Sequence, residues 1–315
     1  MISADFLAEL QRLGPLRTQE ALSRHTTFGV GGPAGAYFVA HSEEQLRQAV
    51  SIARRHGVPV FILGSGSNIL VGDNGVRGLV IENRANKVEG PRSSGNGTYV
   101  VRAQAGVSFA GMARRLSFAG YAGLEWASGI PGTLGGAVVY NAGAYGGCLL
   151  DVLKGVRVAD EKDAILEMAP QDLALGYRGS VFTRGIMRDK VVLSVHLVVY
   201  PGEARALRQR VEELDARRKA AQPKGRNAGS IFKNPIERPA WWLIDQVGLR
   251  GCRIGDAQIS DRHTNFILNL GKARAADVKA LMDLARRRVH EQFSIELEPE
   301  VAQVGEGFNG EKRAA

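Results

Sequence analysis

The stretch GLEWASGIPGTLGGAVVYNAGAYGG, residues 123–147, is the most informative part of the sequence. It holds eight of the 39 glycines, yet it also carries large apolar residues, so its composition differs from that of a flexible Gly/Ser linker. Glycine at this density between strand-like segments indicates backbone that passes close to something flat or charged. We therefore expect a ligand to lie against this stretch.

A second glycine-rich turn lies earlier, at Gly64-Ser65-Gly66-Ser67-Asn68. Its G-x-G begins like a dinucleotide fingerprint, but the third glycine is missing, and Ile69–Val71 predicts a strand where that motif needs a helix. It also lacks the Lys-Ser/Thr pair of a P-loop. Successive backbone N–H groups, helped by serine and asparagine side chains, could instead hold a diphosphate. The alternative is a plain tight turn, but two such segments in one half of the chain favour a cofactor between two small α/β lobes.

Composition and charge bound the class of protein. The chain has 315 residues, 44% of them hydrophobic and 23% charged, which is typical of a globular protein of two or more domains. The net charge of +9 includes arginine runs in helix-like segments without interleaved aromatics, which favours solvated helix faces over nucleic-acid binding. Cys148 and Cys252 lie far apart without metal-ligand neighbours, so we expect no metal site and a reducing cytoplasm. We see no signal peptide or apolar run of about 18 residues, and expect no membrane insertion.

Apolar periodicity predicts the secondary structure, with a domain boundary near residue 200. The expected helices follow the capping residue Ser42 up to Gly57 and cover 109–120, 203–221, 239–247 and 276–293. The expected strands are 58–63, 69–71, 79–81, 99–103, 152–158, 164–168, 191–200 and 264–270.

Five motifs together resemble one known family. They are LGSGSN at 63–68, the stretch at 123–147, YRGSVF at 177–182, NAGSIFKNP at 227–235 and LEPEV at 297–301. In this order, and over Thr26 to Val301, the chain resembles UDP-N-acetylenolpyruvoylglucosamine reductases, in the shorter type without a substrate-covering tyrosine loop. The resemblance implies an α+β protein with an FAD-binding fold of the vanillyl-alcohol-oxidase type in two lobes, 1–90 and 91–200. A C-terminal α+β substrate domain would cover 201–315.

The resemblance also implies an activity. The expected reaction is the NADPH-dependent, FAD-mediated reduction of UDP-N-acetylenolpyruvoylglucosamine to UDP-N-acetylmuramate, a precursor of cell-wall peptidoglycan. NADPH and the sugar nucleotide would take turns in one cleft, in a protein for which we favour a monomer. The FAD contacts that the resemblance implies are Gly64, Ser65, Gly66, Ser67, Asn68, Ser128, Gly129, Ile130, Pro131, Gly132, Thr133, Gly135, Gly136, Asn141, Gly143 and Ala144.

The chemistry of this reaction sets what the site must contain. Hydride goes to the methylene carbon of the enolpyruvyl group, negative charge grows on the carboxylate, and the adjacent carbon is protonated. The site therefore needs a cation or donor at the carboxylate and a proton donor. Arg178 is a permanent bidentate donor suited to a carboxylate, although a surface ion pair is the alternative.

The resemblance assigns the proton to Ser230, which the local sequence alone would describe as a turn serine. It also selects Glu300 as a catalytic glutamate. The residues themselves do not choose between Glu298 and Glu300, because Pro299 favours an extended segment in which both point the same way.

The resemblance gives the expected substrate contacts as Tyr145, Tyr177, Asn234, Gln258 and His263. Position alone suggests Lys219, Lys224 and Arg226 for the substrate diphosphate. Two other functions remain open at this point. One is an FAD oxidase of the same fold acting on a small alcohol, and the other is a basic protein that binds nucleic acid or polyphosphate.

Overall fold

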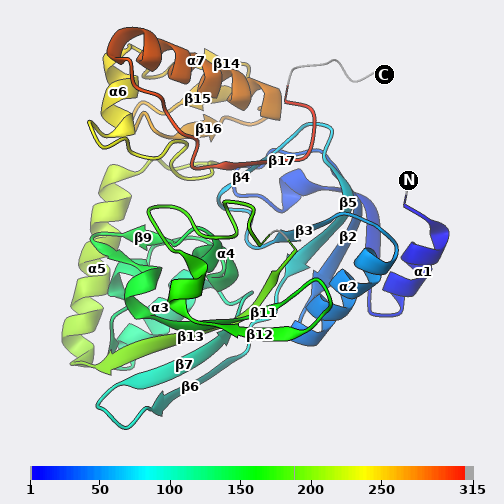
Figure 1. The fold of residues 1–315 in the computed structure, drawn as a ribbon. Coiled ribbons are helices and arrows are strands. Elements are labelled where there is room, and N and C mark those ends of the chain that lie inside the picture. Colours follow the sequence, from blue (N-terminus) through cyan, green and yellow to red (C-terminus); the bar gives the residue numbers. More distant parts are fainter. Residues whose placement is uncertain (1, 188, 309–315) are drawn as a thin grey trace. The chain divides into compact units, whose positions relative to one another are not determined.

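The computed structural model describes residues 2–187 and 189–308 (Figure 1). Its helices are α1 (Ala4–Gln11), α2 (Glu43–Arg55), α3 (Phe109–Phe118), α4 (Leu134–Val139), α5 (Ala204–Ala221), α6 (Ala240–Gln246) and α7 (Ala275–Phe293). Its strands are β1 (Leu16–Ala21), β2 (Pro33–Ala40), β3 (Val60–Leu63), β4 (Ile69–Val71), β5 (Val76–Asn83), β6 (Val88–Ser93), β7 (Tyr99–Gln104), β8 (Tyr121–Ala122), β9 (Gly143–Ala144), β10 (Gly147–Cys148), β11 (Leu153–Ala159), β12 (Ile165–Met168), β13 (Val191–Pro201), β14 (Arg253–Ile254), β15 (Ala257–Ile259), β16 (Ile267–Asn269) and β17 (Ala302–Val304).

The chain forms two compact units that share it in alternating segments. Unit 1 takes in the chain up to Leu16, Phe38–Gly64 and Ile81–Ala220. Unit 2 takes in Arg17–Tyr37, Ser65–Val80 and the chain from Ala221 onward. The chain passes from one unit to the other within β2 and within β5, which belong to a sheet of order β1-β2-β5-β3. The division expected at residues 90 and 200 stays a prediction.

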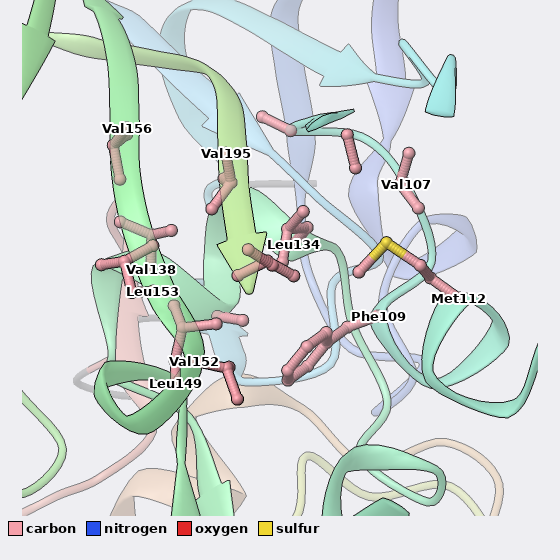
Figure 2. Close-up of a cluster of buried hydrophobic side chains, with 14 of the residues drawn as sticks. Val107, Phe109, Met112, Leu134, Val138, Leu149, Val152, Leu153, Val156 and Val195 are labelled. Carbon is pink, nitrogen blue, oxygen red and sulfur yellow. The ribbon is translucent and has the colours of Figure 1, made fainter. Parts of the chain in front are cut away.

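Unit 1 is built on a sheet of order β12-β11-β13-β7-β6, in which each adjacent pair is antiparallel. The inward-facing side chains of β7, β11 and β13 pack against apolar residues of α3 and α4 (Figure 2). Phe109, Leu134, Val138, Leu149 and Val195 are at most 1% exposed in this cluster. Burial of this kind contributes about 25 cal/mol per Å² of apolar surface, so the cluster fixes where α3 and α4 lie.

Unit 2 has a separate core around the antiparallel sheet β14-β15-β16. α7 packs on β14 and β15 with Val278, Leu281 and Val289 fully buried (Figure 1). Its first turn is capped from a distant part of the chain, because the Asp73 carboxylate accepts hydrogen bonds from the backbone amides of Ala275 at 2.9 Å and of the next residue at 3.1 Å. Just before Asp73 lies β4, which pairs in parallel with β17.

Most expected elements are present with shifted ends. α2 begins after Ser42, whose Oγ accepts from the Gln45 amide at 3.1 Å, and it ends before Gly57. β4 covers Ile69–Val71, as expected. The strand expected at 264–270 is shorter, because Asn265 uses its side chain to hold the backbone of Phe232 and only Ile267–Asn269 pairs with β15. α4 lies inside the glycine-rich stretch, where no helix was expected.

Candidate active site

Two glycine-rich segments meet inside unit 1. Gly64 follows strand β3, and Thr133 precedes helix α4. A Cβ added to Gly64 would lie 2.5 Å from Oγ1 of Thr133, which leaves room for glycine alone. Gly64 and Thr133, one from each segment that the sequence singled out, are therefore neighbours in space.

The turn that follows Gly64 keeps backbone donors available. Gly66 is buried with φ 62°, and a Cβ there would overlap the carbonyl oxygen of His25. Within the described residues, the backbone amides of Ser65 and Gly66 donate no hydrogen bond. Adjacent amides without a partner are what an anion-binding nest requires. β4 starts directly after Asn68, so any bound anion would be held without a helix dipole.

The second segment is held at both ends by hydrogen bonds and offers the same kind of donor. Ser128 is 1% exposed, and its carbonyl oxygen accepts from Nε of Arg114 at 2.9 Å. Thr133 caps α4 with its side chain. Between them, the amides of Gly129 and Gly132 donate no hydrogen bond to any residue that the structure describes. This backbone can approach a flat ligand closely, because neither glycine has a side chain.

Other residues of the expected FAD set lie along the same segment. Asn141 is 6% exposed, and its side chain is engaged by the chain itself: Nδ2 donates to the carbonyl oxygen of Gly176 at 3.0 Å, and Oδ1 accepts from the Leu150 amide at 3.1 Å. Gly135 packs with its Cα against Ala105. The rest of this set consists of exposed Pro131 and Gly136, half-buried Ile130, Gly143 and Ala144, and half-buried Ser67 in the first turn.

These observations fit an FAD. The unbonded amides of the first turn suit a diphosphate, and the glycine backbone of the second segment, held by buried contacts, suits a planar ring. A Cβ added at Gly66 would overlap the carbonyl oxygen of His25, and one added at Gly129 would lie 2.9 Å from Cδ of Arg218, so each segment presents bare main chain at these glycines.

Arg178 is displayed by a tight turn in unit 1. Gly176 and Gly179 exchange backbone hydrogen bonds of 3.0 and 3.3 Å, and Arg178 at the tip has φ 51°. A left-handed arginine costs about 1 kcal/mol, and such strain is common where a side chain must be aimed. Nη2 of Arg178 donates to the carbonyl oxygen of Gly143 at 2.9 Å, which ties it to the glycine-rich segment. Its guanidinium lies 5.6 Å from the ring centre of Tyr177, which is 60% exposed.

A second cationic group of unit 1 was missed by the sequence analysis. Arg218 on α5 belongs to a run that was expected to be a solvated helix face, but it is half-buried, with its Cδ close to Gly129. Burial lowers the pKa of its guanidinium, and the charge of Arg178 lowers it further, whereas Tyr145 and Asp215 raise it. Arg218 has no ion pair or hydrogen bond within the described residues. Such a half-buried cation is suited to an anionic ligand.

Tyr145 completes this group. It has φ 52° and is 37% exposed, and the guanidinium of Arg217 lies 5.3 Å from its ring centre. Tyr145 lies within the glycine-rich stretch, and Arg178 is bonded to that stretch through the carbonyl oxygen of Gly143. No local signal separates Arg218 from its neighbours in the run, because its burial comes from Gly129, far away in the sequence.

Ser230 and Glu300 are brought together in unit 2. Ser230 follows Gly229, which has φ 78° and whose amide donates to Oδ1 of Asn227 at 2.9 Å. The amide of Glu300 donates to the carbonyl oxygen of Ile231 at 2.8 Å, so the two segments lie side by side. Asn68 of the first glycine turn joins them, because its Nδ2 donates to the carbonyl oxygen of Glu300 at 3.2 Å.

Glu298 and Glu300 have different surroundings, although they were expected to point the same way along a strand. Residues 297–301 form only an isolated bridge, between Phe232 and Pro299. Glu298 is exposed and pairs with Nζ of Lys233 at 2.5 Å, whereas Glu300 is half-buried. Glu298 is therefore engaged in an exposed ion pair, whereas the backbone of Glu300 is bonded to Ile231 and to Asn68.

The remaining expected substrate contacts also lie in unit 2. Asn234 is exposed, and its Oδ1 accepts from the Ala240 amide at the start of α6 at 3.0 Å. Gln258 on β15 donates to the carbonyl oxygen of Gly251 at 3.3 Å. His263 lies against Phe266 with ring centres 4.9 Å apart, and its buried Nδ1 has no hydrogen-bond partner among the residues that the structure describes. Burial lowers the pKa of this imidazole.

Comparisons with known proteins agree with this geometry. Residues 221–304 match the family model for the C-terminal domain of UDP-N-acetylenolpyruvoylglucosamine reductase, and residues 34–169 match that of an FAD binding domain. The UDP-N-acetylenolpyruvoylglucosamine reductase of Synechococcus sp. is 43% identical over 296 residues, which cover 93% of this chain and 92% of that protein. The chain belongs to the UDP-N-acetylenolpyruvoylglucosamine reductase family.

Other members of the UDP-N-acetylenolpyruvoylglucosamine reductase family show the same extent of similarity. The enzyme of that name from Moorella thermoacetica is 43% identical over 92% of this chain and 94% of its own length. The crystal structure of UDP-N-acetylenolpyruvylglucosamine reductase from Thermus caldophilus superposes with a TM-score of 0.74 at 37% identity, covering 92% of this chain and all of that one.

Membership of this reductase family confirms two predictions. The fold is an α+β FAD-binding fold followed by a C-terminal domain of the family's own type. The chain is an FAD-dependent oxidoreductase. Among the described residues, none of the helices combines the length and the apolar character that crossing a membrane would need.

Proposed function

We propose that this oxidoreductase reduces UDP-N-acetylenolpyruvoylglucosamine to UDP-N-acetylmuramate with NADPH, in peptidoglycan precursor synthesis. NADPH and a proton are consumed, and NADP⁺ and the lactyl ether are formed. One observation carries the proposal: within unit 2, the backbone of Glu300 is bonded to Ile231, the residue after Ser230, and to Asn68 of the first glycine turn. This supports a role for Ser230 and Glu300 near the segment proposed for the FAD diphosphate.

When bound, FAD would serve as the hydride carrier between NADPH and the enolpyruvyl methylene carbon. The chain holds it through Gly64–Asn68 and through the segment from Ser128 to Ala144, including the residues named above for it. Main-chain N–H groups suit this role because they are fixed, uncharged donors that can bind phosphate and ring oxygens without rearranging.

Arg178 is proposed to bind the enolpyruvyl carboxylate. Its Nη2 donates to the carbonyl oxygen of Gly143, and a planar guanidinium matches the two oxygens of a carboxylate in geometry and charge. Charge that grows on the carboxylate during hydride addition strengthens these bonds, which lowers the barrier. Arg218, whose Cδ lies close to Gly129 of the glycine-rich stretch, is proposed to add a second positive charge to the site.

Ser230 is proposed to give its hydroxyl proton to the substrate carbon next to the carboxylate. A serine hydroxyl is a weak acid, so efficient proton transfer requires that it be held at a fixed position next to the substrate carbon. Glu300, in its protonated form, would donate to the developing carboxylate charge. Glu298 is not suited to this role, because it is exposed and paired with Lys233.

The other expected substrate contacts stay proposals for the parts of the sugar nucleotide. Tyr145 and Tyr177 lie beside cationic side chains, where an aromatic ring and a cation can both contact a sugar phosphate. Asn234, Gln258 and His263 are proposed for the nucleotide part. Lys219, Lys224 and Arg226 remain candidates for the diphosphate, and all three are exposed.

The reaction also suggests the setting of the enzyme. A role in cell-wall synthesis, and so in cell shape and division, implies work in the cytoplasm, where both the sugar nucleotide and NADPH are found. We propose a monomer with FAD-binding lobes at 1–90 and 91–200 and a substrate domain at 201–315.

The test is a spectrum followed by two additions. The purified protein is expected to be yellow, NADPH is expected to bleach it without oxygen, and the enolpyruvyl sugar nucleotide is expected to restore the colour. Ser230→Ala should bleach at the normal rate and recover at least about 100-fold more slowly, while the exposed Ser94→Ala behaves as the parent. Recovery with oxygen but not with the sugar nucleotide would indicate an oxidase, and a colourless protein that takes up no FAD would indicate a binding protein.

A further inference from the structure

One loop of unit 2 bonds two segments of the proposed site at once. The amide of Thr27 donates to the carbonyl oxygen of Gly66, in the first glycine turn, at 3.0 Å. The hydroxyl of Thr27 donates to the carbonyl oxygen of Asn227, three residues before Ser230, at 2.7 Å. A single residue therefore connects the turn that fits a diphosphate with the segment that carries the proposed proton donor.

The bond to the glycine turn is part of a tight contact. Gly66 is buried, and the space beside its Cα is filled by the backbone of His25 and Thr26. The main chain on both sides has no rotamer to adjust. A shift of the turn when a ligand occupies it must therefore move the loop that holds Thr27.

The bond to Asn227 is close to Ser230 in the structure as well as in the sequence. Asn227 closes a turn on Gly229 through its Oδ1, and Ala228 between them is 1% exposed in the core of unit 2. On the other side of Ser230, the amide of Ile231 is held by the carbonyl oxygen of Asn265 at 2.9 Å. The serine thus lies between one anchor in the core and one anchor at Thr27.

We propose that Thr27 is a positioning residue that sets the Ser230 hydroxyl and couples it to occupancy of the first glycine turn. The inference rests on the proposed function, in which the turn holds the FAD diphosphate and Ser230 protonates the substrate. Thr27 acts through Asn227 and transfers no proton itself. A hydroxyl can donate one hydrogen bond at a time, and the longer separation of 3.4 Å from the carbonyl oxygen of Gly66 makes Asn227 its acceptor.

Two variants separate this role from general support of the loop. Thr27→Val keeps the shape of the side chain and removes the donor to Asn227. Thr26→Val is the matched control, because its hydroxyl donates within the same loop, to the carbonyl oxygen of Val30 at 3.0 Å. Thr27→Ser restores the donor and should restore the function.

The kinetic readout follows the two halves of the reaction in the holoenzyme. In Thr27→Val, flavin reduction by NADPH is expected to proceed at the parent rate. Hydride transfer to the enolpyruvyl substrate is expected to be about 10- to 100-fold slower, because displacement of the proton donor lowers the rate by this factor. Its solvent deuterium isotope effect should increase, since protonation becomes limiting. Thr26→Val and Thr27→Ser are expected to stay within about threefold of the parent.

A second readout does not depend on activity. Hydrogen exchange of the amides at 228–231 is compared with and without FAD for each variant. FAD should slow exchange there in the parent, in Thr26→Val and in Thr27→Ser, and this effect should be absent in Thr27→Val. Circular dichroism establishes that every variant is folded.

The outcomes decide the question. Parent-like transfer and parent-like FAD protection in Thr27→Val would overturn the inference, and so would equal losses in Thr26→Val and Thr27→Val. A parent enzyme whose reduced flavin ignores the enolpyruvyl sugar nucleotide would instead contradict the proposed function. In that case the exchange measurement still supports or overturns the coupling between the turn and the Ser230 segment.

Discussion

Gly66→Ala is a direct test of the first glycine turn. Gly66 has φ 62°, and an added methyl group would overlap the carbonyl oxygen of His25 and lie 2.8 Å from Cα of Thr26. Alanine in this left-handed conformation costs about 1 kcal/mol. The overlap adds to this cost, because it involves main-chain atoms that can be relieved only if the turn and the loop move apart.

The magnitude can be worked out against Gly57→Ala. Gly57 follows α2 with φ 63°, and no atom of residues 2–187 and 189–308 outside its neighbours lies within 4 Å of a Cβ built there, so this variant carries the strain without the overlap. Its free energy of unfolding should fall by about 1 kcal/mol. Gly66→Ala should also lose the two hydrogen bonds of Thr27, at about 1 kcal/mol each, which gives a loss of about 3 kcal/mol.

Urea unfolding of the FAD-free protein, followed by circular dichroism, measures both changes. A fluorescence titration with FAD then measures affinity, which should be unchanged in Gly57→Ala and at least about 10-fold weaker in Gly66→Ala. Equal destabilisation of the two variants together with equal FAD affinity would refute the reasoning, because the close backbone contact would then have no energetic consequence.

Three further predictions concern the site and the cores. In steady-state kinetics, Glu300→Gln should lower kcat by about 100-fold or more. The kcat of Glu298→Gln should stay within about twofold of the parent, since an exposed ion pair contributes at most about 1 kcal/mol. The reverse order of the two effects would show that the assignment is wrong. Leu134→Ala should lower the free energy of unfolding by about 2–5 kcal/mol in urea, because Leu134 is fully buried in the cluster of Figure 2, and a loss below about 1 kcal/mol would contradict that packing. Burial lowers the pKa of His263, so the unfolded chain binds a proton more readily than the folded one. The contribution of His263 to stability is therefore complete above about pH 6.5 and declines as the pH falls through that value. Between about pH 7.5 and 5.5, the urea midpoint of His263→Gln should fall less than that of the parent, and an equal fall would count against burial as the cause.

The sequence was most informative where a local rule decides the structure. The Ser42 cap and the apolar face after it are enough to place α2, because both act within a few residues. The apolar strand Ile69–Val71 directly after the turn at Gly64–Asn68 was also readable, and it excludes the common dinucleotide motif, which needs a helix there. Motifs spread over the chain then carried the family and the cofactor.

Tertiary contacts decided the features that the sequence left open. α4 contains Gly135 and Gly136, which disfavour a helix locally, but the Thr133 cap and the burial of Leu134 outweigh this. Arg218 looks like its neighbours in a basic run until Gly129 packs against it. Such effects depend on partners far away in the chain, so periodicity cannot reveal them.

The choice between Glu298 and Glu300 has the same origin. Their spacing gives them equal standing in the sequence, and only the position of Lys233 separates them. The family resemblance, and not the local sequence, selected Glu300. The ion pair of Glu298 with Lys233 now gives a physical reason to prefer Glu300, because it engages the other carboxylate.

The pairing of β17 with β4 has a consequence for how the chain is made. β4 is synthesised long before its partner at Ala302–Val304. Until that partner has been made, Ile69–Val71 is an apolar strand without its neighbour, and the turn before it lacks the Glu300 contact of Asn68. We therefore expect a chain that stalls or is cut before residue 300 to keep this strand available for aggregation, so a chaperone that covers it would raise the yield of native protein.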